Sequence, residues 1–250
     1  MLFCYNQSFK GDIMPNEEKL KKLLPDFSVT VLDTVDSTNS YLKRLSPKNR
    51  SLVVAKYQES GRGRQGKSFY SPRDTGIYMS IFLPIEPFSL LTPTVAISVC
   101  DVLDKISENP AKIKWVNDIF ILGRKVSGIL SEKTDNGVII GIGINLETDT
   151  FPDEIKDIAG SVFPNEKDKS KIISDIVASL LRNLENRSVL EDYKSRLFFL
   201  GSEISFIKNG EKITATAVDV NSDGNLIVLK DNTEITLISG EISLGSENFK

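Results

Sequence analysis

The sequence predicts an α+β protein in which a larger mixed domain precedes a small all-β domain. Of its 250 residues, 40% are hydrophobic and 26% are charged, which is the ordinary balance of a globular protein. Apolar residues recur at helical spacing over residues 171–187, whereas short alternating runs separated by turn residues follow residue 201. We therefore expect one domain over residues 1–200 and a second over residues 201–250.

The first elements of the larger domain are expected to be a helix, a strand and a second helix. A short amphipathic helix over residues 17–24 is ended by Pro25 and precedes a strand over residues 28–32. Asp36-Ser37 then provides an N-terminal cap for the second helix.

The rest of the larger domain is expected to be rich in strands. Thr92-Pro93 supplies a cap and a first helical residue for a helix that runs towards Ile106. The repeated apolar residues of the last helix, over residues 171–187, are expected to face the core. The strands are expected over residues 51–56, 77–83, 112–115, 119–122, 125–132 and 138–144.

The last 50 residues contain short alternating strands and turn residues. Turns are expected at Asn209-Gly210, Ser222-Asp-Gly224 and Asp231-Asn232. Closely spaced short strands of this kind predict a small barrel. The five strands are expected over residues 204–207, 213–220, 226–229, 234–237 and 241–244.

Charge and residue usage exclude several classes of chemistry. The 31 basic and 34 acidic side chains give a net charge of −3, which argues against bulk nucleic-acid binding but leaves room for a local basic patch. The chain has no histidine, so Ser-His-Asp, Cys-His and histidine-metal sites are excluded. Cys4 and Cys100 are too few for a zinc site or a disulfide framework, which fits a reducing compartment. Charged-group chemistry such as phosphoryl or nucleotidyl transfer is therefore favoured over acyl hydrolysis.

The start of the chain carries no sign of a targeting segment. Its apolar residues, Met1–Tyr5, are too few for a secretory core. No apolar run approaches the ~20 residues that cross a bilayer. We expect a soluble cytoplasmic protein without a membrane partner.

A glycine-rich basic loop, Gly61-Arg-Gly-Arg-Gln-Gly-Lys67, stands out between two expected strands. Its glycines free the backbone and its three cationic side chains can donate to anions, so the loop suits an adaptable anion cradle. It lacks the Walker A spacing, and neither an acidic ribose partner nor a βαβ context accompanies its match to the dinucleotide spacing. An arginine-rich surface loop and an RNA-contacting patch are the alternatives.

A second polar cluster comprises Lys114-Trp-Val-Asn-Asp118 together with Lys125 and the following Gly128. These residues lie where two expected strands meet, so either they converge on a pocket or they form an exposed turn beside a core tryptophan. A single Lys-Trp pair would be typical of an exposed turn. The second lysine, Lys125, favours convergence on a pocket.

Two further motifs have both structural and binding interpretations. Asp36-Ser-Thr-Asn39 caps a helix, and such a turn also exposes hydroxyl and N–H groups to a small polar ligand. Gly141-Ile-Gly-Ile-Asn145 is either a core strand in which the glycines relieve crowding or a surface against which a ligand lies.

Taken in order, these motifs resemble the bacterial biotin protein ligases, also called biotin–[acetyl-CoA-carboxylase] ligases. The resemblance runs from about Thr34 to the C-terminus and includes Gln58, Ser71-Pro72 and the final Gly240-Glu-Ile-Ser-Leu244. It implies a mixed-sheet catalytic domain related to class II aminoacyl-tRNA synthetases, followed by an SH3-like barrel. It also implies that biotin and ATP form biotinyl-5′-AMP and that the biotinyl group passes to a lysine of a biotin carboxyl carrier protein or domain.

The same resemblance implies roles for individual residues. Biotin would contact Ser37, Thr38, Asn39, Gln58, Arg62, Gly63, Arg64, Lys125 and Gly128. The nucleotide would contact Arg62, Arg64, Phe69, Lys114, Asn117 and Asn145. Catalysis would rest on Arg64, Lys114, Asp118 and Lys125, with no protein metal site and with Mg²⁺ delivered by ATP.

This chemistry is compatible with a chain that has no histidine. A carboxylic acid with a pKa of about 4 to 5 is ionised at pH 7, so the biotin carboxylate needs no general base to attack phosphorus. It needs relief of repulsion between two anions, which Arg64, Lys114, Lys125 and Mg²⁺ can provide. The acceptor lysine must lose a proton, and we expect Asp118 to orient or assist that amine.

Three departures from the family pattern accompany the resemblance. Phe69 stands where the family usually has a tryptophan that packs on adenine, Val116 stands in place of a proline, and Gly245 replaces an arginine of some relatives. A weaker adenine stack is expected, and a contact from the barrel to the nucleotide is placed in doubt.

Alternatives to a biotin ligase also follow from the sequence. The chain before Asp36 is too short for a winged helix-turn-helix domain of roughly 60 residues, so we expect no DNA partner. A lipoate or octanoate ligase of the same fold is the nearest alternative, and a non-enzymatic RNA-binding module is another. Monomeric and homodimeric states are both left open.

Overall fold

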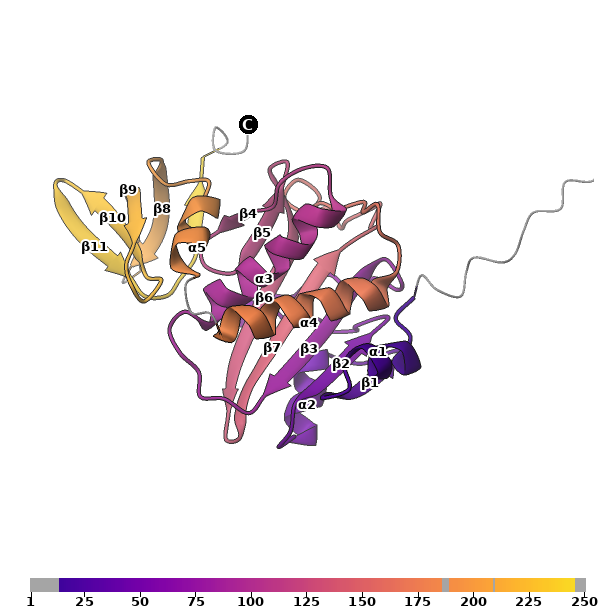
Figure 1. Cartoon of the computed structure of the whole chain (residues 1–250). Coiled ribbons are helices and arrows are strands. Elements are labelled where there is room, and N and C mark those ends of the chain that lie inside the picture. The colour runs from indigo at the N-terminus through magenta and orange to yellow at the C-terminus, as the bar shows by residue number, and fades with distance from the viewer. Residues whose placement is uncertain (1–13, 186–188, 209, 246–250) are drawn as a thin grey trace, which may run out of the picture.

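The structure, a computed structural model, describes residues 14–185, 189–208 and 210–245 and contains two β-sheets (Figure 1). Cys4, Met1–Tyr5, Asn209 and the end of the helix predicted over residues 171–187 lie outside the described residues. Within the described residues, every helix is too short or too polar to cross a membrane.

The larger sheet has seven strands in the order β1-β2-β3-β7-β6-β5-β4. The β1–β2 pair is parallel and the other pairs are antiparallel, so the predicted mixed sheet is confirmed. The strands are β1 (Ser28–Leu32), β2 (Ser51–Ala55), β3 (Gly76–Leu83), β4 (Lys112–Lys114), β5 (Asp118–Ile121), β6 (Arg124–Thr134) and β7 (Gly137–Asn145).

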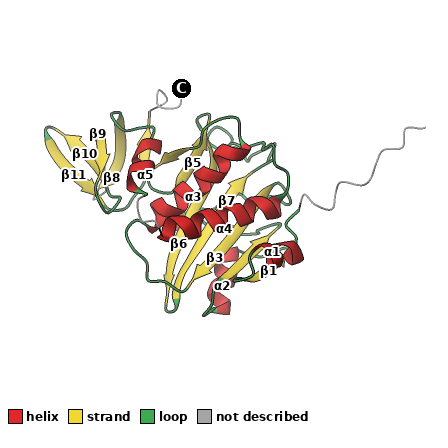
Figure 2. Ribbon diagram, in the orientation of Figure 1, coloured by secondary structure: helices red, strands yellow, loops and turns green. Residues whose placement is uncertain are grey.

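Helices cover the two faces of this sheet unequally. Figure 2 shows α3 (Leu91–Ile106) and α4 (Lys169–Glu185) crossing one face, where their apolar residues join the main core. The short helix α2 (Thr38–Leu45) packs on the other face, with Leu42 against Phe82 and Ile139. Most of that second face remains available for a site.

The ends of the helices differ from the predicted ends at several places. The α1 helix (Glu17–Leu23) and Ser37 as the cap of α2 match the prediction. The α3 helix begins at Leu91 with Leu90 at the cap position, so Thr92 is not its cap, and the predicted start was wrong by two residues (92 − 90). The short helix α5 (Leu190–Arg196) was not predicted, because seven residues with one buried side chain give little periodic signal.

The C-terminal sheet contains the five strands that the sequence predicts. Its order is β11-β10-β9-β8-β12, and every neighbouring pair is antiparallel. Among the described residues β11 and β12 form opposite edges, so the sheet is open there. The strands are β8 (Glu203–Lys208), β9 (Glu211–Val220), β10 (Leu226–Lys230), β11 (Thr233–Leu237) and β12 (Ile242–Leu244).

The C-terminal sheet is attached to the larger sheet through an apolar core and polar contacts. The buried indole of Trp115 donates a hydrogen bond to the backbone oxygen of Gly224 at 2.9 Å. Lys194 of α5 pairs with Asp219 of β9 at 3.0 Å. The cores of the two sheets are continuous, because buried residues of both belong to one apolar cluster.

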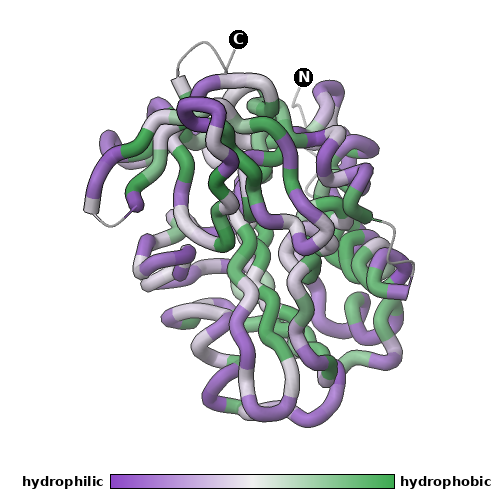
Figure 3. Tube along the Cα trace, turned by 90° about the vertical axis from the view of Figure 1, so that its left-hand side faces the viewer, coloured by the Kyte–Doolittle hydropathy of each residue, from purple (hydrophilic) through white to green (hydrophobic). Residues whose placement is uncertain are grey.

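Figure 3 shows hydrophobic residues along the chain segments inside the molecule and hydrophilic residues at the turns.

Candidate active site

The separate motifs of the sequence meet at one cavity of about 300 Å³ on the less covered side of the larger sheet. A cavity of this size suits a small-molecule ligand. All of the residues expected to bind or to react line it, namely Ser37, Thr38, Asn39, Gln58, Arg62, Gly63, Arg64, Phe69, Lys114, Asn117, Asp118, Lys125, Gly128 and Asn145. The convergence that the sequence left open is therefore present.

The cavity is strongly cationic although the chain as a whole is acidic. Its lining includes five basic side chains, Arg62, Arg64, Lys67, Lys114 and Lys125, against two carboxylates, Asp118 and Glu241. The whole chain has a net charge of −3. Positive charge gathered in a concave site attracts anionic ligands.

The polar end of the cavity is built where α2 begins. Gln58 Oε1 accepts hydrogen bonds from the Thr38 backbone N–H at 2.9 Å and from the Thr38 hydroxyl at 3.2 Å. Gln58 Nε2 donates to Ser71 Oγ at 2.9 Å, and Ser80 Oγ lies 2.7 Å from Thr38 Oγ1. These side chains are buried, so the network fixes their donors and acceptors before any ligand binds.

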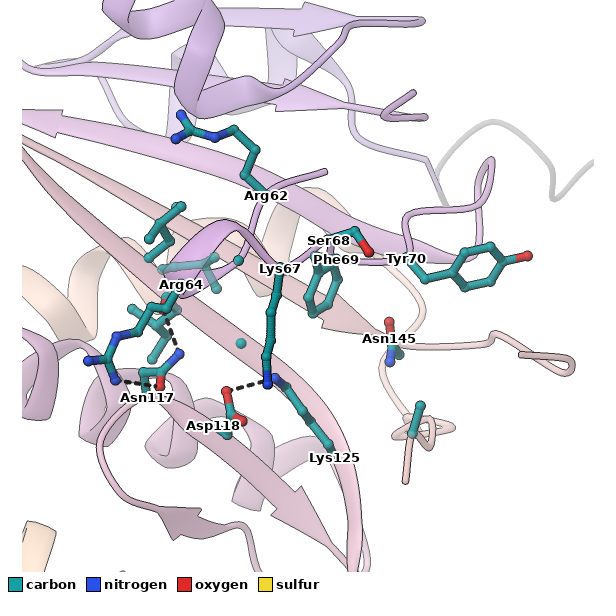
Figure 4. Close-up of a pocket in the computed structure, with 18 of the residues that line it drawn as sticks. Arg62, Arg64, Lys67, Ser68, Phe69, Tyr70, Asn117, Asp118, Lys125 and Asn145 are labelled. Atoms are coloured by element: carbon teal, nitrogen blue, oxygen red, sulfur yellow. Dashed lines mark hydrogen bonds and ion pairs between the residues drawn. The ribbon is translucent and has the colours of Figure 1, made fainter. Parts of the chain in front are cut away.

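The charged end of the cavity is built from β5, β6 and the loop between β4 and β5 (Figure 4). Lys125 Nζ lies 2.7 Å from Asp118 Oδ1, and Arg64 Nη1 donates to Asn117 Oδ1 at 3.2 Å. Asn117 Nδ2 donates in turn to the backbone oxygen of Ile129 at 2.9 Å. Arg64 and Lys125, which are 61 residues apart in the sequence (125 − 64), thus reach the same site.

The neighbouring Lys114 is partly buried, and its surroundings lower the pKa of its ammonium group. Burial lowers the pKa of Lys114, and the nearby cations Lys125 and Lys67 lower it further, while Asp118 and Glu241 oppose the change. The ammonium group therefore loses its proton more readily than that of an exposed lysine.

A β-bulge places Lys125 and Gly128 on the same side of β6. Lys125 pairs with Phe120 of β5, whereas the next paired residue is Ser127, opposite Ile119. The unpaired Val126 enters the core, and the alternation of sides restarts after it. The regular alternation of a strand would place Lys125 and Gly128 on opposite faces.

Protein side chains, rather than empty space, lie against two of the strand glycines. A Cβ atom on Gly143 would lie 2.5 Å from the Phe69 ring, and one on Gly141 would lie 2.4 Å from the Asn39 amide oxygen. These glycines therefore make room for Phe69 and Asn39 in the cavity wall, which favours the interpretation that they relieve crowding.

The glycine-rich loop contributes part of the cavity lining. Gln65 and Gly66 both adopt positive φ values, 53° and 76°, within a short turn over Arg64–Gly66. Lys67 pairs with Glu241 of the C-terminal segment. The Arg62 side chain points away from Lys67 and Lys125 in Figure 4.

Several residues that shape the cavity were missed by sequence reasoning. Ser80 completes the polar network, and Glu132 holds Arg62 with an N–O separation of 3.4 Å. Ser71 and Glu241 belong to motifs that the sequence singled out, but no role was assigned to them there; Ser71 accepts from Gln58, and Glu241 reaches the loop. Glu132 lies two and four residues after Leu130 and Gly128, so the period of a strand places it on their side. That signal was available in the sequence, because Gly128 was already a predicted site residue and the bulge lies before it.

Comparison with known proteins identifies the family. Residues 31–149 match the Biotin/lipoate A/B protein ligase family, and residues 199–245 match the Biotin protein ligase C terminal domain. The "Bifunctional ligase/repressor BirA" of Escherichia coli is 29% identical to this chain over 92% of this chain and 78% of its own length. The "Biotin--[acetyl-CoA-carboxylase] ligase" of Mycobacterium tuberculosis is 24% identical over 76% of this chain and 77% of its own length.

A solved structure covers nearly the whole of the described fold. The biotin protein ligase from Aquifex aeolicus, in complex with biotin and ATP, is 30% identical and has a TM-score of 0.77. The match covers 86% of this chain and 97% of that protein. The two family matches, the order of the motifs and this shared fold lead to one conclusion: this chain belongs to the biotin protein ligase family.

Proposed function

We propose that this protein is a biotin–[acetyl-CoA-carboxylase] ligase, which joins biotin to ATP and then transfers the biotinyl group to a carrier lysine. The observation that carries the proposal is the gathering of five cationic side chains and a pre-formed polar network in one cavity. The membership of the family and the Aquifex aeolicus complex with biotin and ATP support the choice of substrates.

In the first step, a carboxylate oxygen of biotin attacks the α-phosphorus of ATP. A new O–P bond forms, the bond to the β-phosphate breaks, and pyrophosphate leaves with its electron pair. The reactants are both anionic, so the main demand on the protein is to offset their repulsion. Arg64, Lys114 and Lys125 are the side chains that we assign to this task, because they line the cavity together.

The polar end of the cavity suits the ureido ring of biotin. Such a ring carries N–H donors and a carbonyl acceptor, and Ser37, Thr38, Asn39 and Gln58 offer both kinds of partner in fixed positions. Gly63 and Gly128 also line the cavity and are assigned to biotin. Arg62 is assigned to biotin and nucleotide binding at the edge of the cavity.

The nucleotide is assigned to the region that contains Phe69 and Asn145. The Asn145 amide nitrogen donates to the backbone oxygen of Gly160 at 3.1 Å. Its buried amide oxygen has no hydrogen-bond partner among the described residues, so it can accept from an amino group of the base. Gly240, Glu241 and Ile242 also line the cavity, which supports a contact from the C-terminal segment to the nucleotide.

In the second step, the amine of the carrier lysine attacks the acyl carbon of biotinyl-5′-AMP. A C–N bond forms, AMP leaves with the electrons of the C–O bond, and the amine loses a proton. Asp118 is the carboxylate at the reacting end, 2.7 Å from Lys125, and is assigned to orienting that amine. The acceptor is a lysine of a biotin carboxyl carrier protein or domain.

Mg²⁺ is proposed to enter with ATP. In phosphoryl-transfer sites this ion is held mainly by substrate phosphates and water, with one or two protein carboxylates. The two carboxylates that line the cavity are paired with lysines, Asp118 with Lys125 and Glu241 with Lys67, so we assign the ion to the phosphates and to no protein ligand. The ion adds positive charge where the phosphates accumulate negative charge.

The domain organisation is proposed in the form that the sequence predicts. One domain would span residues 1–200, with a sheet like that of class II aminoacyl-tRNA synthetases, and an SH3-like barrel would span residues 201–250. Two separate sheets with different strand orders support this division. We also propose a cytoplasmic location and no DNA partner, the latter supported by the net charge of −3.

The decisive experiment is a side-by-side incubation with two candidate acids. The protein is mixed with MgATP, a biotin carrier domain, and either biotin or lipoate, and pyrophosphate release and carrier mass are measured. We expect release with biotin and a carrier that gains one biotinyl group, whereas a carrier with arginine in place of its acceptor lysine gains none. Activity with lipoate alone would favour a lipoate ligase, and activity with neither acid would contradict the proposal.

A further inference from the structure

Glu132 of β6 connects the wall of the cavity to two other elements. Its Oε2 atom accepts a hydrogen bond from Asn39 Nδ2 of α2 at 2.8 Å. Its Oε1 atom accepts from Lys43 Nζ at 2.6 Å and lies 3.4 Å from Arg62 Nη2 of the glycine-rich loop. The Glu132 side chain is only 16% exposed, so this carboxylate is a largely enclosed junction.

The contacts of the Asn39 amide allow only one orientation of this group. Its nitrogen donates to Glu132 and, at 3.3 Å, to the backbone oxygen of Leu130, and both partners can only accept. Its oxygen accepts from Ser80 Oγ and lies on the Gly141 side of the cavity wall. A reversed amide would place its oxygen against two other acceptors, which is unfavourable in a buried site.

The oxygen that this orientation presents retains capacity for a ligand. An amide oxygen has two lone pairs, and the hydrogen bond from Ser80 Oγ uses one of them. Asn39 is buried but lines the cavity, so the second lone pair is available to a donor there. A reversed or mobile amide would offer a donor at the same place and would repel an N–H group.

The negative charge of Glu132 is required for this arrangement. Burial opposes its ionisation, but hydrogen bonds from Lys43 and Asn39 and the charges of Lys43 and Arg62 outweigh that effect and lower the pKa of Glu132. A carboxylate has acceptors on both oxygens, whereas a glutamine would place an NH₂ group against either Asn39 or Lys43. A neutral isostere therefore conflicts with one of its donors.

We propose that Glu132 is a positioning residue that holds the Asn39 amide with its oxygen towards the cavity, as the acceptor for a ureido N–H of biotin. The inference rests on the proposed function, since it specifies how the same site recognises its substrate. It assigns Glu132 no contact with biotin or with the reacting atoms. Its effect is thus expected in biotin binding rather than in the chemical step.

The test is a double-mutant cycle on biotin affinity, measured by isothermal titration calorimetry with the full chain. Glu132→Gln is expected to weaken biotin binding about tenfold, the effect of one misdirected buried hydrogen bond. In an Asn39→Ala background the same change is expected to weaken binding less than about twofold, because Glu132 then has no amide to orient. At saturating biotin, kcat for pyrophosphate release is expected to stay within about threefold, so that the loss falls on KM.

Two control variants separate this role from a purely structural one. Glu86→Gln removes another carboxylate that pairs with a lysine, Lys133, at 3.3 Å, and is expected to leave biotin affinity unchanged. Lys43→Met removes the ion pair of Glu132 but leaves its contact with Asn39, and is expected to change affinity less than about twofold. If Lys43→Met reproduces the full loss, Glu132 acts through the ion pair and the inference is wrong.

The remaining outcomes are also decisive. Equal losses from Glu132→Gln with and without Asn39, or unchanged affinity, would overturn the inference. Should thermal melting show that Glu132→Gln does not fold, the cycle is run with Glu132→Asp, whose shorter carboxylate is expected to give a smaller loss that again vanishes without Asn39. A wild-type protein that binds no biotin would instead refute the proposed function itself.

Discussion

The two faces of the seven-stranded sheet use the same strands for different purposes. On the face under α3 and α4, β7 contributes Ile140, Ile142 and Ile144 to the apolar core. On the other face the intervening residues include Gly141 and Gly143, which line the cavity. Because neighbouring residues of a strand point to opposite faces, one segment can stabilise the fold and shape the site. Substitutions one residue apart should therefore affect either stability or binding.

The largest expected effect is on catalysis, when a positive charge is removed from the cavity face of the sheet. Lys125→Met should reduce kcat/KM for biotin-dependent pyrophosphate release about 10³-fold, because a preorganised cation at the reacting end is removed. Lys133→Met, on the same strand but exposed and paired with Glu86, should retain activity. Thermal melting should show both variants folded. An unchanged rate for Lys125→Met would remove this residue from the mechanism.

The next largest effects are expected from substitutions at two neighbouring residues of β7, one on the core face and one on the cavity face. They test most directly whether the two faces have separate roles. Ile140→Ala should lower the free energy of unfolding by about 3 kcal/mol, since it leaves a cavity in the core, with biotin affinity largely retained in the folded protein. Gly141→Ala should instead weaken biotin binding, because its Cβ would lie 2.4 Å from the Asn39 amide oxygen. Chemical denaturation and calorimetry measure the two quantities. If both variants lose stability and affinity in equal proportion, the two faces are not separable.

The smallest expected effect is a change in the pH profile. Burial is the largest cause of the lowered pKa of Lys114, so its positive charge is lost as pH rises through a value below that of an ordinary lysine. Adenylate formation should therefore decline on the alkaline side, and Lys114→Arg should move that decline to higher pH because arginine stays protonated. Pyrophosphate release between about pH 7 and 10 measures this, with Lys112→Arg on the same strand as control. If the wild type, Lys114→Arg and Lys112→Arg all lose activity over the same alkaline pH range, Lys114 does not set the pH profile.

Most of the elements could be predicted from local patterns. The cap at Ser37, the strand periodicities and the turn residues all depend on neighbours within a few positions, and the structure has these elements close to the expected bounds. The prediction failed where local signal was weak or misleading. Thr92 resembles a cap, yet packing of Leu91 into the core starts α3 earlier.

The candidate site was predictable as a set of residues but not as an arrangement. The spacing of Lys114, Asp118 and Lys125 indicates a polar junction, and the structure brings them together. The bulge at Val126 could not be read from the sequence, because it depends on how β5 and β6 pair. Glu132 was recognised only as the end of a strand, because its partners Asn39 and Arg62 lie 93 and 70 residues away in the sequence (132 − 39 and 132 − 62).

The amino-acid sequence by itself determined the mixed α+β class, the absence of histidine chemistry and the identity of the cationic and polar residues. Only the tertiary structure decided that Phe69 packs on Gly143, that Asn39 is held by Glu132, and that Lys125 and Gly128 share a face. The physical reason is that helix caps and strand periods are set by local backbone preferences. Strand register and buried hydrogen bonds are set by partners as far as 109 residues away, as between Trp115 and Gly224, which no local pattern specifies.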